Sequence, residues 1–95
     1  MRAHEVFTAL SDPTRREIVV TLAHHGSSTA TELASEMPIS RQAVAKHLTT
    51  LHRADLVRPQ RRGRETHYRL TPEPFNKAID WLEEVCQRVQ SHTAS

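Results

Sequence analysis

The 95-residue chain has little of what several kinds of protein need. It has one cysteine, two glycines and only 4% aromatic residues, and no apolar run, such as that from Ile18 to Val20, exceeds three residues. One cysteine cannot form an internal disulfide, which is typical of the reducing cytoplasm. A membrane span needs about 20 apolar residues, and residues 1–5 lead into no apolar segment of a secretory signal. We therefore expect a cytoplasmic protein with no membrane partner.

The shortage of glycine also bears on catalysis. Two glycines do not provide a phosphate-binding glycine loop, and the chain shows neither a nucleophile with its base nor a pair of carboxylates suited to acid–base chemistry. We therefore expect no enzyme activity and no cofactor. The length suits one domain over residues 1–95, and an apolar content of 37% predicts that a partner subunit helps to complete the core.

What the chain does have is positive charge concentrated in its middle third. Residues 41–69 contain eight basic residues against two acidic ones, whereas both flanking segments are net negative. Seven of the eight are arginines, whose forked guanidinium groups suit phosphates and the edge of guanine. The alternative is a solvated basic face without a partner, but this concentration favours a polyanion.

Capping signals divide the first quarter of the chain into two helices. The first is predicted over residues 2–10. Asp12 as N-cap and Pro13 at the first helical position then begin a second helix, which runs to about His25 and stops at Gly26. A polar connection, residues 27–28, follows.

The next two predicted helices form a helix-turn-helix over about residues 30–54. Thr29 and Glu32 have the spacing of a capping box and open a short helix, which Pro38 prevents from continuing. Ser40 caps a helix over residues 41–54. Its inward stripe consists of Val44, Leu48 and Leu51. Two short helices joined by a tight turn are typical of DNA-binding proteins.

A β-hairpin is predicted over about residues 56–70. Residues 56–60 suit an edge strand because Pro59 has no N–H for a ladder, Arg62-Gly63 marks the turn, and residues 65–70 alternate. A hairpin directly after a helix-turn-helix is a wing. The predicted fold is therefore mainly α with a small β-hairpin wing, a winged helix-turn-helix in the order α-α-α-α-β-β-α.

A long amphipathic helix is predicted over about residues 74–90, beginning at Pro74 after a break and followed by a frayed end. Its apolar positions form a long stripe at helical spacing, which suits a contact with a partner subunit.

Helix 41–54 turns a polar, cationic arc away from its apolar stripe, as expected of a recognition helix in the major groove. Gln42 suits a bidentate pair with adenine, and Arg41 suits one with guanine. The wing arginines suit the neighbouring minor groove. The DNA contacts predicted from the residues are Ser40, Arg41, Gln42, Ala45, Lys46, Thr49, Arg53, Arg61, Arg62 and Arg64.

These motifs together resemble the ArsR/SmtB-type winged-helix repressors of bacteria. The resemblance is carried by residues 10–16, 32–34, 39–48, 54–57 and 62–64, with Leu51, Tyr68 and Leu70. It implies a homodimer that binds an imperfect palindrome and whose first and last helices form the interface. The candidate interface residues are then Val6, Phe7, Leu10, Phe75, Ile79, Trp81, Leu82, Val85, Cys86 and Val89. Family contacts carry over to Ser40, Arg41, Gln42, Ala45 and His47, although His47 lies near the core flank of its helix and packing is an equal alternative for it.

The metal sites of that family have no counterpart here. The stretch from Thr29 to Ala34 lacks the cysteines of one site, and Leu82 stands where the other site has a histidine. His24 and His25 suit the C-terminal end of a helix dipole, and Cys86 suits a small apolar role in the stripe. We therefore expect no metal site.

The sequence thus predicts a homodimeric, sequence-specific DNA-binding repressor or autorepressor. One alternative is a metal- or redox-responsive repressor of the same family with a non-standard effector site. The other is a winged-helix protein-interaction module, which would more naturally show apolar residues on the outward arc of helix 41–54. The effector and the operator sequence cannot be read from the residues.

Overall fold

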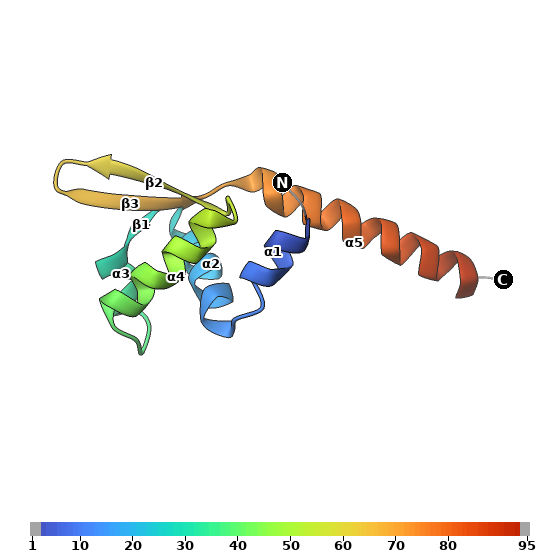
Figure 1. The fold of residues 1–95 in the computed structure, drawn as a ribbon, viewed down its shortest axis with the longest axis horizontal. Coiled ribbons are helices and arrows are strands. Elements are labelled where there is room, and N and C mark those ends of the chain that lie inside the picture. The colour runs from blue at the N-terminus through green and yellow to red at the C-terminus, as the bar shows by residue number, and fades with distance from the viewer. Residues whose placement is uncertain (1–2, 94–95) are drawn as a thin grey trace.

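The computed structural model describes residues 3–93 as a mainly helical fold with a small antiparallel sheet (Figure 1). In chain order the elements are α1 (Ala3–Ala9), α2 (Pro13–His25), β1 (Ser28–Thr29), α3 (Ala30–Ser35), α4 (Arg41–Arg53), β2 (Val57–Arg62), β3 (Glu65–Leu70) and α5 (Pro72–Thr93). Helices α3 and α4 form the helix-turn-helix, and β2 and β3 form the wing. The predicted winged helix-turn-helix fold is confirmed, with one strand added.

The three predicted N-caps all satisfy a backbone donor of their helix. Asp12 accepts from the backbone N–H of Arg15 at 3.0 Å, and Ser40 accepts from that of Ala43 at 3.1 Å. Thr29 and Glu32 form the full capping box, with reciprocal bonds of 3.1 and 2.8 Å. Each cap fixes where a helix begins, and so fixes the direction in which the helix leaves its loop.

The carboxyl groups of Asp12 and Glu32 predict that the fold is less stable in acid. A hydrogen bond from the Arg15 backbone lowers the pKa of Asp12, and one from the Thr29 backbone lowers the pKa of Glu32. A carboxylate whose folded pKa is lowered stabilises the protein at neutral pH, and this contribution is lost as the pH falls through the folded pKa. The free energy of unfolding is therefore expected to decrease as the pH falls below about 4. Urea denaturation at a series of pH values measures it, and the combined variant Asp12→Asn, Glu32→Gln should show a shallower decrease. A variant that keeps the full decrease would contradict this account.

The core lies where α2, α3 and α4 meet the base of the sheet. Among the large side chains that are fully buried are Ile18 and Leu22 from α2, Leu33 from α3, and Leu48 from α4. The stripe predicted for α4 faces inward as expected, since Val44 and Leu51 are also fully buried. Burial of this stripe turns the opposite face of α4 to solvent.

The sheet has three strands rather than the two predicted. Its order is β1-β3-β2, and β1 pairs with β3 through Ser28 opposite Tyr68 and Thr29 opposite His67. The sequence gives no sign of β1, because two polar residues show no alternation, yet both side chains are buried. Strand β2 is an edge strand, as Pro59 predicts, and the turn contains Gly63 at φ +61°.

The last helix is longer than predicted at both ends. It begins at Pro72 rather than Pro74, because a proline in the first turn of a helix needs no N–H. Residues 91–93, expected to be frayed, are helical; residues 94 and 95 lie outside the described residues. Figure 1 shows α5 extending well beyond the rest of the fold, with α1 beside its first part. Within residues 3–93, no helix is both long and apolar enough to cross a membrane.

Candidate nucleic-acid interface

Helix α4 presents the predicted contact residues to solvent. Ser40, Arg41, Gln42, Ala45, Lys46, Thr49 and Arg53 are all exposed. The hydroxyl of Thr49 donates to the carbonyl of Ala45 at 3.1 Å within the helix. Arg41 and Gln42 directly follow the cap residue Ser40. The first turn of α4 therefore combines a charged fork, an amide and the free backbone donors of a helix start.

His47 differs from the rest of the predicted contact set. Its side chain is half-buried, and it is close enough to Asp12 to help lower the pKa of that carboxyl, although the backbone bond from Arg15 contributes most. This agrees with its predicted place on the core flank of the helix. His47 is therefore less open to a ligand than the other predicted contacts of α4.

The arginines at the tip of the wing are exposed but differ in their partners. Arg61 donates through Nε to the carbonyl of Gly63 at 3.1 Å, and Arg62 donates to Oε1 of Gln60 at 3.4 Å. Both are therefore held to their own hairpin. Arg64 makes no hydrogen bond or ion pair with any residue between 3 and 93, so its guanidinium is available to a ligand.

Two further arginines on the wing were missed by the sequence reading. Arg58 lies directly opposite Arg69 in the β2–β3 ladder, and both are exposed. Like charges in directly opposed positions destabilise a sheet, and a nearby polyanion would relieve this repulsion. The alternation of residues along each strand was the available signal. Only the register between the two strands shows that the two arginines lie opposite each other.

The candidate dimer surface lies on α1 and α5. Phe7 and Trp81 meet edge-on with ring centroids 5.5 Å apart, and each keeps at least a third of its surface exposed. From Ile79 onward, α5 leaves a stripe of apolar side chains open to solvent. Its exposed members are Ile79, Leu82, Val85, Cys86 and Val89.

Four of the residues predicted for this surface differ in how much of their side chain the protomer leaves exposed. Val6 is only 1% exposed, so its side chain belongs to the protomer core and has no surface left for a partner. Leu10 and Phe75 are partly buried against the same core. Cys86, by contrast, is exposed, because α5 has left the protomer core by that point.

One pair of ionisable side chains outside these surfaces joins the end of α2 to the end of α3. His25, at the end of α2, lies 3.1 Å from Oε2 of Glu36, next to the C-terminus of α3. No group of three or more histidine, cysteine, aspartate or glutamate side chains within residues 3–93 is arranged to hold a metal ion.

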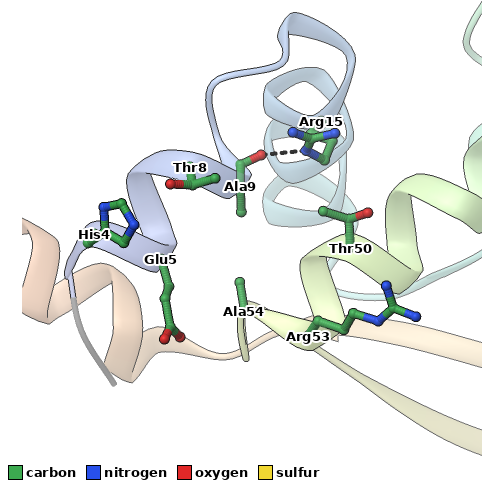
Figure 2. A pocket seen from close by; sticks show the side chains of 8 residues that line it. All are labelled: His4, Glu5, Thr8, Ala9, Arg15, Thr50, Arg53 and Ala54. Atoms are coloured by element: carbon green, nitrogen blue, oxygen red, sulfur yellow. Dashed lines mark hydrogen bonds between the residues drawn. The ribbon is translucent and has the colours of Figure 1, made fainter.

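A hollow of about 250 Å³ separates α1 from the start of α2 and the end of α4. Figure 2 shows its lining and shows Arg15 directed toward the carbonyl of Ala9, to which its Nε donates at 2.5 Å. This bond closes the end of α1 onto α2. Arg15 therefore serves the packing of α1, which in turn carries part of the candidate dimer surface.

Comparisons with known proteins agree on one family. A family profile described as a helix-turn-helix domain matches residues 10–60. The transcriptional repressor SdpR of Bacillus subtilis is 34% identical over 79 residues, 83% of this chain and 87% of that protein. The HTH-type transcriptional regulator Rv2034 of Mycobacterium tuberculosis is 47% identical over 64 residues, 67% of this chain and 59% of that protein.

The solved structures lead to the same result. An ArsR-like transcriptional regulator from Rhodococcus sp. RHA1 matches with a TM-score of 0.83 and 39% identity, covering 97% of this chain and 86% of that one. The match includes the capped helix-turn-helix and the wing that carry the exposed cationic residues. The chain therefore belongs to the ArsR-type family of winged-helix regulators, which bind DNA to control transcription and are not enzymes.

Proposed function

We propose that the protein acts as a homodimeric repressor or autorepressor that binds an imperfect palindrome. The observation that carries this proposal is the separation of two surfaces: cationic residues gather on α4 and the wing, while unpaired apolar residues gather on the projecting part of α5. One surface suits DNA and the other suits a second copy of the chain. A cytoplasmic location follows from this function.

The argument for a second copy starts from the length of α5. Its 22 residues span about 33 Å, whereas only its first turns, with Pro74 and Ala78 buried, pack on the protomer. Trp81 and Leu82 are 49% and 46% exposed. Aromatic and large aliphatic side chains at helical spacing are typical of the apolar centre of a homodimer interface. Two α5 helices packed with their neighbouring α1 helices would bury this stripe.

The argument for DNA rests on the orientation of α4. Its buried face fixes the outward direction of Gln42, Lys46 and Arg53, which is the direction a recognition helix needs in the major groove. The wing would then reach the flanking minor groove through its arginines. Two-fold symmetry would place the half-sites about 10 bp apart or at a multiple of that distance.

Two variants distinguish the recognition of a base from the attraction of phosphates by positive charge. Gln42→Ala is expected to relax the preference for one base pair in each half-site by about 1–3 kcal/mol, since a bidentate amide pair is lost. Arg62→Ala is expected instead to weaken binding to all duplexes and to reduce the salt dependence. Selection of bound sites from random duplexes, followed by gel-shift titration at several salt concentrations, measures both effects.

Glu17→Ala, a change of an exposed side chain on α2, serves as the control and should leave both measurements unchanged. If the wild-type protein selects no sequence from the random pool, the proposal of sequence-specific binding is wrong. If the wild-type protein selects a sequence and the Gln42→Ala variant shows the same base preference, the assignment of Gln42 is wrong.

A further inference from the structure

A hollow of about 270 Å³ lies between the start of α4 and the tip of the wing. Its lining includes Arg41 and Arg64, which were expected to contact different grooves of the DNA. The lining also includes three hydroxyl-bearing side chains with no predicted DNA contact, those of Thr31, Thr66 and Tyr68. We call these five residues the notch.

The notch exists because of the short strand β1. The pairing of Ser28 with Tyr68 joins the segment before α3 to β3. The register of the hairpin then puts Thr66 and Tyr68 on the same face of β3 as Leu70, whose side chain packs on the core. This face is turned toward α3, so Thr31 in the first turn of α3 borders the same space. The pairing of β1 with β3 thereby fixes the position of the helix-turn-helix relative to the wing.

The chemistry of the notch is that of an anion site. Neither Arg41 nor Arg64 has a hydrogen bond or ion pair with any residue from 3 to 93, in contrast to Arg61 and Arg62. Guanidinium groups and hydroxyls are the donors that bind phosphate oxygens in protein–DNA interfaces. The other lining residues are compatible with this: Thr29 is the cap of α3, Ala30 is apolar, and Glu65 is exposed with its carboxylate 3.4 Å from His67.

We propose that the notch binds one backbone phosphate of the DNA, held jointly by Arg41 and Arg64. This inference rests on the proposed function and refines it. It makes Arg41 a phosphate contact rather than the reader of guanine expected from its sequence position. It also makes Tyr68, Thr31 and Thr66 parts of the DNA-binding surface. The phosphate would lie where the backbone passes from the groove occupied by α4 to the groove reached by the wing.

A double-mutant cycle tests whether the two arginines hold the same phosphate. Arg41→Ala and Arg64→Ala are each expected to reduce the slope of log K against log salt concentration by up to about 0.9, the value for one phosphate. The double variant should lose about 0.9 in total rather than about 1.8. Arg41→Ala combined with Arg69→Ala is the matched control, because Arg69 lies outside the notch, and its effects should add.

Two further variants test the hydroxyl and the acidic residue. Tyr68→Phe keeps the ring and removes only the hydroxyl, and it should weaken binding to operator and unrelated duplexes equally, by roughly tenfold. Glu65→Gln removes a negative charge beside the notch and should tighten binding. Ethylation of single phosphates should identify one position that blocks the wild type and no longer affects the double variant. Thermal unfolding of each variant checks that the fold is kept.

The possible results separate the two proposals. If the wild type binds no duplex, the proposed function fails and the notch fails with it. If the wild type binds but the two arginines act additively and Tyr68→Phe has no effect, only the notch is wrong. If Arg41→Ala changes the selected base instead of weakening all duplexes alike, Arg41 reads a base and the phosphate assignment is overturned.

Discussion

Replacing Leu82 and Val85 together by glutamate is expected to convert the proposed dimer into monomers and to lower operator affinity by about 100-fold or more. Both side chains are well exposed in the protomer, at 46% and 38%, so a folded monomer should survive the change. Paired carboxylates facing each other across a dry interface carry a large desolvation and repulsion cost. A monomer also loses the gain in affinity from binding two half-sites at once, which commonly amounts to 10²–10⁴.

Analytical ultracentrifugation gives the oligomeric state of this variant, and gel-shift titration gives its affinity. Gln87→Glu is the control, since it adds one negative charge to α5 about 140° away from Leu82 around the helix. The control should remain dimeric and bind DNA normally. A Leu82, Val85 variant that still sediments as a dimer would show that two copies meet through another surface.

The second large effect concerns the core beneath the recognition helix. Leu48→Ala is expected to destabilise the protein by about 2–5 kcal/mol, because the side chain is 1% exposed and its removal leaves a cavity under α4. A domain this small has only about 5–15 kcal/mol of stability in total. DNA binding should fall as well, because α4 is held in place by this stripe.

Urea denaturation at a fixed protomer concentration measures this change, since the stability of a dimer depends on concentration. Val20→Ala is the control: it shortens a side chain that is 55% exposed on α2 and should cost less than 1 kcal/mol. A Leu48→Ala protein as stable as this control would mean that the packing of α4 is not what fixes its position.

Most of the helices could be predicted because their signals are local. A cap such as Ser40 and a stripe such as that headed by Val44 lie within one helix, and both are read from spacing alone. Strand β1 could not be predicted in this way. Its two residues are strand only because Tyr68, forty residues later, supplies the partner, and a pairing between distant segments leaves no mark on either segment by itself.

The same distinction separates the site residues that were predicted from those that were missed. Gln42 and Lys46 follow from the helical wheel of one helix, and the structure leaves both exposed. Tyr68 and Thr31 acquire a role in the notch only when α3 is placed against the wing. The burial of Val6 could not be predicted, because its apolar character is equally suited to a core or an interface, and only the packing of α1 buries it within the protomer.

The pairing of β1 with β3 has a consequence for regulation. Because it fastens the wing to the helix-turn-helix, each protomer should reach its half-site as a rigid body with a fixed shape. We do not expect such a protomer to release the operator by moving its wing away from its helix-turn-helix. We therefore expect any signal that frees the operator to change the angle or distance between the two protomers, through the packing of the projecting ends of α5.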